Sequence, residues 1–540
     1  MRLKYIYSFI LMIGGILHSA NLLAQADSSL VDINYFEKSN VWLSSKNVAG
    51  LNYFKLSKLS TGELYANKGF GDFRNYYQSN NQYSYGLKAK SFHRLNPNIV
   101  FKGSVDYQQF SGKNMSGSSF IDPTITPFDI LETDISNKGI KELETYKLSG
   151  AISARLNSKL TIGGKLDYGV ASFAKTKDLR HINKLLDLDI DIGLIYQLSK
   201  RLTVGGGYGY GRRIEELNFR IFGNVTSQYN YMVSFGAFYG MEEVFTPSIS
   251  GGAYAADGTS GSNPLANFSH NASLQLNLAL NNNWSLFQDF SYVKQNGYYG
   301  NKGTAAKLFT EHNADQVAYK LSIIKEIGRN QHQLSVGGQY QQLINMEHKY
   351  IPGTSSGGVS TTIYLGKVEV LDKQQLNVKL DYTFFKEVEN HFPKWEFNLA
   401  ADYFRLQQTA SMSPYYRDQT INSYQANINL KRNIFNTNNI YSWFLGLGYG
   451  SGSGLAKYDS FYIDPSTTAP PTSMDLYLYQ EFEYFTKPRV MADVSLQYTK
   501  KMKQNIAPYA KLSYNYTKAF DTQFLGGSFG IIGASVGCNF

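Results

Sequence analysis

The sequence ends in the stretch SFGIIGASVGCNF, residues 528–540, in which two kinds of residue alternate. Counting back from the end, every second residue is apolar: Phe540, Cys538, Val536, Ala534 and Ile532. The residues between them are small or polar: Asn539, Gly537, Ser535 and Gly533. Because successive side chains of a strand point to opposite faces, the stretch predicts an extended strand with one apolar face and one small or polar face.

The whole chain is rich in aromatic residues without being hydrophobic on average. Its 540 residues include 42 Tyr and 34 Phe, and 17% are charged; the mean hydropathy is −0.32. A transmembrane β-barrel has this balance, because only every second residue of a strand faces lipid and aromatic girdles lie at both interfaces. A helical membrane protein needs about 20 consecutive apolar residues per span, and no such run follows the N-terminus. The composition therefore favours an all-β fold, a transmembrane antiparallel β-barrel.

The same alternation recurs upstream. In residues 376–384 the outward set is Leu376, Val378, Leu380, Tyr382 and Phe384, and the inward set is Asn377, Lys379, Asp381 and Thr383. It is repeated in residues 99–107, 160–170, 272–280, 395–403, 490–499 and 506–516. A soluble β-sandwich alternates too, but it would not place charged residues on its enclosed face.

We expect about 18 strands, each of the roughly 9 to 11 residues that a tilted transmembrane strand needs. Counts of about 16 or 14 are the alternatives, if residues 59–68 or the weakest pairs lie outside the wall. Short polar turns are predicted at residues 95–98, 156–159, 198–201, 281–283, 328–331, 390–394, 433–439 and 501–505. Long connections are predicted to include residues 112–142, 218–267, 297–314, 350–372 and 450–487. Because barrels of this kind have short periplasmic turns and long extracellular loops, both termini are expected on the periplasmic side.

The N-terminus has the pattern of a signal peptide, residues 1–26. Arg2 and Lys4 precede an apolar run over residues 5–17, and Ala24-Gln25-Ala26 offers a cleavage site after Ala26, or alternatively after Ala24. The other interpretation, a single anchor helix, is disfavoured because the apolar part is short. Residues 27–58 are then a periplasmic N-terminal segment or a short hatch, and residues 59–540 form the barrel. The segment is too short for the plug domain of large energy-coupled receptors.

Charged residues are predicted on the lumen-facing side of several strands. They are Lys102, Asp106, Lys165, Asp167, Lys379, Asp381, Glu396, Asp402, Asp493 and Lys511. One hypothesis is a transverse field that orients dipolar solutes. The other, which we favour, is that opposite charges pair across strands and keep the interior solvated or locked.

Several other activities are disfavoured by what the sequence contains. The histidines are scattered, without a nucleophile elbow or metal-ligand spacing, so we predict no enzyme, no catalytic residue, no metal and no cofactor. Cys538 is the single cysteine, which excludes an intramolecular disulfide. The net charge of +10 is spread along the chain, and no nucleic-acid motif accompanies it. The loop over residues 218–267 could constrict the lumen or present an aromatic platform for a glycan or a lipoprotein, and residues 451–484 leave the same choice.

The sequence carries three resemblances to known groups of proteins. The terminal Phe540 resembles the C-terminal aromatic of bacterial outer-membrane barrels, which the barrel insertion machinery reads. Residues 56–60 (LSKLS), 68–74 (KGFGDFR), 122–134 and 146–150 resemble an uncharacterised family of outer-membrane β-barrel proteins of the Bacteroidota. Residues 177–187 continue the resemblance, but they lack the Arg-Pro pair that this family tends to carry there. Residues 47–51 (NVAGL) resemble the Asn-Pro-Ala-Gly stretch in the hatch of outer-membrane long-chain fatty-acid transporters, with Val48 in place of Pro.

Together these features predict an outer-membrane protein of a Gram-negative bacterium, porin-like in layout and exported by its signal peptide. The expected function is a channel or transporter for an unidentified solute. One alternative is a non-transporting scaffold or surface-binding protein acting with a lipoprotein partner, and a second is a transporter of fatty-acid-like hydrophobic compounds. The expected partners are outer-membrane lipid, the insertion machinery and a surface lipoprotein, with no nucleic acid.

Overall fold

The computed structural model describes residues 31–224, 227–245, 253–256, 261–281, 283–302, 306–354, 360–465, 468–502 and 506–540. The predicted signal peptide, residues 1–26, lies outside the described residues. So do residues 27–30 of the predicted N-terminal segment, residues 282 and 503–505 of the predicted turns, and parts of the predicted long connections.

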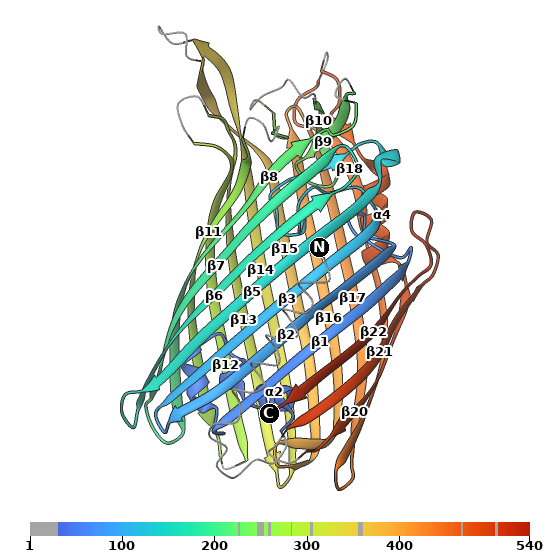
Figure 1. Ribbon diagram of the computed structural model, residues 1–540. Coiled ribbons are helices and arrows are strands. Elements are labelled where there is room, and N and C mark those ends of the chain that lie inside the picture. Colours follow the sequence, from blue (N-terminus) through green and yellow to red (C-terminus); the bar gives the residue numbers. More distant parts are fainter. Residues whose placement is uncertain are drawn as a thin grey trace.

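The described residues form a closed, antiparallel 18-stranded barrel (Figure 1). Its strands are β1 (Lys58–Gly71), β2 (Asn81–Asn96), β3 (Ile99–Met115), β5 (Gly139–Arg155), β6 (Leu160–Lys175), β7 (Arg180–Gln197), β8 (Leu202–Arg220), β11 (Asn263–Ala279), β12 (Trp284–Gly300), β13 (Leu308–Ile327), β14 (Asn330–Thr354), β15 (Ser360–Glu389), β16 (Phe392–Met412), β17 (Tyr415–Phe435), β18 (Asn439–Phe461), β20 (Arg489–Lys500), β21 (Ala507–Ala519) and β22 (Ser528–Asn539). Each strand pairs with its neighbours in the chain, and β22 pairs with β1. The predicted fold class and strand number are confirmed.

The C-terminal stretch closes the barrel. Strand β22 lies between β21 and β1, and the backbone of Phe540 exchanges two hydrogen bonds with that of Ser60, at 2.8 and 3.0 Å. Ile532 and Val536 are 52% and 56% exposed on the outer face. The alternation at the end of the chain therefore separates an outer apolar face from the lumen.

The outer wall is a continuous apolar surface. Leu399, Ile428 and Leu447 are direct cross-strand neighbours and are 49%, 63% and 56% exposed. An apolar surface that continues around the wall marks contact with hydrocarbon. No helix in the described part of the chain is both long enough and apolar enough to cross a membrane.

Some predicted connections proved shorter than expected. Strands β12 and β13 reach Gly300 and Leu308, so much of the predicted loop 297–314 is paired. In the predicted loop 350–372, pairing continues from Tyr350 with Tyr364 to Thr354 with Ser360, as a hairpin that projects beyond the barrel (Figure 1). Strand β18 also runs on to Phe461, and the outer connection between β16 and β17 is just Ser413-Pro414, so short and long connections do not alternate strictly. The predicted strands were defined by an apolar lipid face, which strands beyond the membrane do not need.

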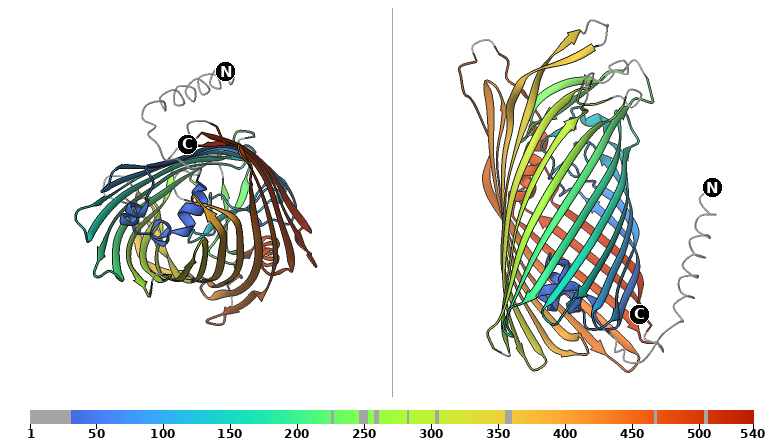
Figure 2. Two further views of the ribbon diagram at one scale, coloured as in Figure 1. Left: turned by 90° about the horizontal axis from the view of Figure 1, so that it is seen from below. Right: turned by 90° about the vertical axis from the view of Figure 1, so that its left-hand side faces the viewer.

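A short helical segment lies inside the periplasmic end of the barrel (Figure 2). It contains α2 (Ile33–Ser39), α3 (Val41–Ser44) and the 3-10 helix η1 (Val48–Tyr53). Side-chain oxygens of Asp32, Asn40 and Asn47 each accept a hydrogen bond from a backbone N–H in the first turn that follows, as helix N-caps do. We call residues 31–54 the hatch.

A second folded element occupies the extracellular end. Strands β4 (Asp129–Glu132), β9 (Tyr229–Ser234), β10 (Tyr239–Phe245) and β19 (Thr472–Ser473) form a separate sheet in the order β19-β10-β9-β4. The 3-10 helix η2 (Ile135–Asn137) follows β4, and helix α4 (Asp475–Thr486) follows β19. A buried cluster joins the sheet to the wall through Phe128, Tyr231, Phe235, Tyr254 and Tyr299. We call residues 116–137, 229–245 and 472–486 the cap.

Candidate functional site

The hatch spans the lumen at its periplasmic end. Its ion pairs run from Asp32 to Lys431 on β17 (2.6 Å), from Glu37 to Lys90 on β2 (2.8 Å) and Lys102 on β3 (3.2 Å), and from Lys38 to Glu396 on β16 (3.0 Å). Burial alone would raise the pKa of Asp32, but Lys431 and two backbone N–H groups outweigh burial and hold that pKa below its ordinary value. The hatch is therefore fixed to separate arcs of the wall by charge.

Asn47 fixes the hatch to a further part of the wall. Its Nδ2 donates to the carbonyl oxygens of Leu194 (2.9 Å) and Gly206 (3.1 Å) and to Oε1 of Gln275 (2.8 Å). These partners lie on β7, β8 and β11. Asn47, the first residue of the stretch 47–51 that resembles a transporter hatch, thus holds this segment to the wall.

Glycines in the wall make room for the hatch. A Cβ at Gly163 would lie 2.6 Å from the backbone nitrogen of Ala49, and one at Gly205 would lie 2.7 Å from Nδ2 of Asn47. Next to Gly205, the buried Trp42 packs edge to face on Phe287, with ring centroids 5.1 Å apart. The wall is shaped to receive this segment.

The cap crosses the other end of the lumen. Lys141 on β5 donates to the carbonyl of Ser118 (2.7 Å), while Lys373 on β15 donates to that of Thr124 (3.1 Å). Strands β5 and β15 are nearly opposite in the strand order. Residues 116–128 therefore form a bar from one wall to the other, and we keep that name for them.

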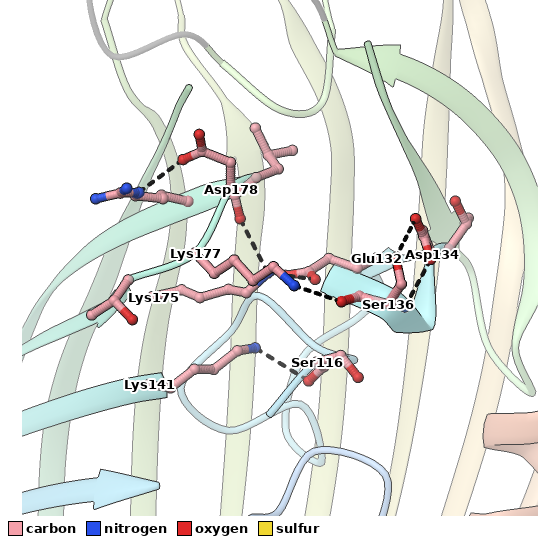
Figure 3. Close-up of polar contacts among 12 residues, drawn as sticks. Ser116, Glu132, Asp134, Ser136, Lys141, Lys175, Lys177 and Asp178 are labelled. Carbon is pink, nitrogen blue, oxygen red and sulfur yellow. Dashed lines mark hydrogen bonds and ion pairs between the residues drawn. The ribbon is translucent and has the colours of Figure 1, made fainter. Parts of the chain in front are cut away.

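Buried charges hold the bar and β4 in place (Figure 3). Nζ of Lys175 lies 2.6 Å from Oε2 of Glu132, and these side chains are 0% and 6% exposed. The buried Lys141 reaches the carbonyl of Ser116 (3.3 Å). The exposed Lys177 reaches that of Ser136 in η2 (2.7 Å). This cluster was not predicted from the sequence, because lysines at strand ends normally face water.

Asp129 is a second buried charge in the cap. It accepts hydrogen bonds from the hydroxyls of Ser118 (2.7 Å) and Tyr76 (3.0 Å). Burial raises the pKa of Asp129 to about 7 despite these bonds. Burial likewise raises the pKa of Glu481 on α4 to about 7.

We expect the cap to loosen as pH rises from about 4 to about 7. The pKa of Asp129 rises from an ordinary value of 3.8 to about 7 on folding, so the folded state binds more protons in this interval and its stability falls as pH rises. Hydrogen exchange of residues 129–132, corrected for the intrinsic effect of pH, should be at least about tenfold faster at pH 8 than at pH 5. Replacing both Asp129→Asn and Glu481→Gln should remove the difference, and an unchanged pH effect in that variant would contradict the assignment.

A chamber lined by both polar and apolar side chains lies between the hatch and the cap. A cavity of about 890 Å³ is lined by Ser44 and Lys46 at one end and by Tyr484 and Phe485 of α4 at the other. A second cavity of about 610 Å³ shares Ser44, Lys320, Gly337 and Lys379 with it. Amide side chains line much of the remaining wall: Gln78, Gln82, Gln339, Asn377, Gln425, Asn398 and Asn429. We call these two neighbouring cavities the chamber.

The structure brings some of the predicted lumen residues together and leaves others apart. Lys379, Asp381, Glu396 and Asp402 line the chamber. Lys102 and Glu396 pair with Glu37 and Lys38 of the hatch, not with charges on neighbouring strands. Elsewhere in the wall Lys165 pairs with Asp167 (2.8 Å) and Asp191 (2.9 Å), Asp106 lies 3.9 Å from Lys88, and Asp493 accepts from Asn515 (2.5 Å). In the described residues Lys511 makes no ion pair.

Other chamber residues were not identified from the sequence. They include Lys46, Asp289, Lys320 and Gly337. Asp289, Lys320 and Gly337 lie on β12 to β14, outside the stretches whose alternation supported the predicted lumen residues, and Lys46 lies in the hatch. Across the described ranges, no group of three or more His, Cys, Asp or Glu side chains has the arrangement of a metal site.

Comparisons with known proteins give a family and distant structural likenesses. A family model described as Family of unknown function (DUF6850) matches residues 48–540, which confirms the predicted resemblance to an uncharacterised family. No curated protein matches. Similar solved structures include the outer membrane transporter YddB from Escherichia coli (8% identity, 90% of this chain and 81% of that one, TM-score 0.40), the ferric preacinetobactin receptor BauA from Acinetobacter baumannii (10%, 89% and 80%, 0.35) and the toluene transporter TodX from Pseudomonas putida (10%, 95% and 94%, 0.27). At these identities and TM-scores the likenesses assign no function.

Proposed function

We propose a transport function for this chain, which belongs to the Family of unknown function (DUF6850). In this proposal it is an outer-membrane barrel that carries a polar solute through its lumen. The hatch closes the periplasmic end and the cap closes the extracellular end. The two closures open in turn.

The observation that carries the proposal is the chamber. A barrel used only as a scaffold has no need of about 890 Å³ of unfilled space in its lumen. The closures at the two ends also differ in chemistry. Ion pairs at 2.6 to 3.2 Å fix the hatch, whereas an aromatic cluster and a buried ion pair fix the cap. Different chemistry allows each end to respond to a different signal.

The chamber lining favours a polar solute. Amide, hydroxyl and charged side chains face the space, including Ser291, Gln339 and Asn377, and aromatic side chains such as Phe404 and Phe485 line another part of it. A fatty-acid-like compound would need an apolar path, because its chain leaves such groups without hydrogen-bond partners. The lining therefore supports transport of a polar solute over transport of a hydrophobic compound.

A scaffold remains the second candidate, because of the projecting hairpin of β14 and β15. Its residues Ile351, Ile363 and Leu365 are 45%, 48% and 64% exposed. Exposed apolar side chains beyond the membrane are typical of surfaces that bind a partner. A surface lipoprotein is the partner we propose for that case.

Single-channel recording in planar bilayers can separate the two candidates. Four refolded proteins are compared: the full chain, a form without residues 31–57, a form with residues 117–137 replaced by a Gly-Ser linker, and a form with both changes. The two closures lie in series, so steady conductance steps are expected from the doubly changed form and few or none from the others. If that form, shown to be folded by its heat-dependent gel mobility, gives no steps, the lumen is not a transport path.

A further inference from the structure

Five residues form a row across the chamber wall. Asp289, Lys320, Gly337, Lys379 and Asp402 are direct register partners on the consecutive strands β12 to β16. All five line the larger cavity. The row therefore presents two lysines on either side of a glycine, with one carboxylate beyond each lysine.

The two lysines have no partner within the protein. Over the described part of the chain, neither Lys320 nor Lys379 makes an ion pair or a hydrogen bond. Lys165 in the same wall does pair, with Asp191 at 2.9 Å, and Lys511, which also makes no ion pair with a described residue, does not line the chamber. Because neither Asp289 nor Asp402 forms an ion pair with its neighbouring lysine, both cations are available to an anion that enters the cavity.

Gly337 keeps the space between the lysines empty. A Cβ there would meet Lys320 Cβ at 3.9 Å and the Tyr319 carbonyl at 3.6 Å, which are ordinary contacts. Packing therefore does not require glycine at this position. Adjacent strands lie about 4.8 Å apart, so the backbones that carry the lysines are about 10 Å apart, a span that two flexible lysines can close around one oxyanion group.

The carboxylates of Asp289 and Asp402 limit which chemical groups the ligand can carry beside its anionic group. Asp289 already accepts from Gln275 (3.0 Å), whereas Asp402 accepts no hydrogen bond from the described residues. Carboxylates accept hydrogen bonds and repel a second negative charge. Groups beside the anion should therefore be donors such as hydroxyls, and the neighbouring Gln339 and Asn377 offer further partners for them.

We propose that Lys320 and Lys379 bind an oxyanion group across the gap at Gly337, and that the solute is a polyhydroxylated organic anion of sugar-acid size. This inference rests on the proposed transport function and names its solute class. The same pair of lysines could take a free inorganic oxyanion, so the test includes one.

Binding is measured by calorimetry on the full chain folded in detergent at low ionic strength, where charge interactions are least screened. Sodium gluconate is the probe, sorbitol its uncharged counterpart and inorganic phosphate the free oxyanion. Gluconate should bind and sorbitol should not. Gluconate binding tighter than phosphate supports an organic acid as the solute, and equal or tighter phosphate binding overturns that solute class in favour of a free oxyanion.

Two lysine variants and one control test the residues. Lys320→Gln and Lys379→Gln should each weaken gluconate binding about tenfold, as expected for loss of one charge-assisted hydrogen bond. Lys511→Gln removes another lumen lysine, which does not line the chamber, and should leave binding unchanged. Absence of gluconate binding, or equal loss in all three variants, would overturn the inference.

Gly337→Asp tests the gap without removing either lysine. Its carboxylate would lie between Lys320 and Lys379 and take the place of the ligand. Gluconate binding should disappear while heat-dependent gel mobility stays as in the unaltered chain; undiminished binding would also overturn the inference. Because binding is measured without transport, a barrel that binds gluconate but gives no conductance steps defeats the transport proposal alone, and the reverse result defeats this inference alone.

Discussion

Gly163→Leu is expected to expel the hatch from the lumen, while Gly164→Leu leaves it in place. A Cβ at Gly163 would lie 2.6 and 2.7 Å from backbone atoms of Ala49 and Val48. No rotamer change can move backbone atoms aside, so the hatch must shift. At Gly164 nothing lies within 4 Å of the added Cβ. These adjacent glycines point to opposite faces of β6, which makes the second a matched control for the first.

The loss of hatch protection in Gly163→Leu should be large, because displacing η1 also breaks other contacts that hold the hatch. Moving η1 also breaks the hydrogen bond from Ser153 Oγ to the Ala49 carbonyl (2.9 Å) and displaces Asn47 from its three partners. Overpacking costs about 1 to 3 kcal/mol, and the upper end corresponds to about a hundredfold loss of protection.

Hydrogen exchange over residues 31–54 measures this release directly. In Gly163→Leu the exchange rates should rise by up to about a hundredfold, and in Gly164→Leu they should match those of the unaltered protein. Equal protection of residues 31–54 in the two variants would mean that the position of the hatch does not depend on the space that Gly163 leaves for it.

The second large effect is expected at the buried ion pair of the cap. Lys175→Met leaves Glu132 buried without its partner, which costs about 3 to 5 kcal/mol for a pair of this kind. The pair joins β6 to β4, which in turn pairs with β9 through Ile130 and Val233. We therefore expect β4 to detach from the cap sheet.

A second substitution separates loss of charge balance from loss of packing. Adding Glu132→Leu to Lys175→Met removes both charges, and replacing a buried pair by apolar residues is often neutral. The hydrogen-exchange rate of β4 should therefore rise in Lys175→Met. In the double variant it should fall most of the way back to the rate in the unaltered protein. The control is Arg329→Met, because its pair with Glu389 is 70% and 45% exposed and should contribute at most about 1 kcal/mol. A double variant as unprotected as the single one would show that packing, and not charge, holds β4.

The wall of this barrel could be predicted from the amino-acid order alone. Alternation at residues 376–384 and 528–540 predicted which side chains face lipid, and Leu380 and Val536 are 46% and 56% exposed as expected. Strand number and topology followed from the same repeat, because adjacent residues of a strand point to opposite faces and so show both faces in the local sequence. The predictions were wrong where strands leave the membrane, as in the hairpin of β14 and β15, since the lipid face that marks a strand ends there.

What fills and closes the lumen was set by contacts between distant parts of the chain. Lys320 and Lys379 lie on either side of Gly337 through the register of three strands, and Lys141 and Lys373 hold one bar from opposite walls. Gly163 leaves space for the backbone of Ala49, which lies more than a hundred positions earlier in the chain. Such contacts depend on register and on the closure of the sheet, which bring together residues far apart in the chain, so no local pattern records them.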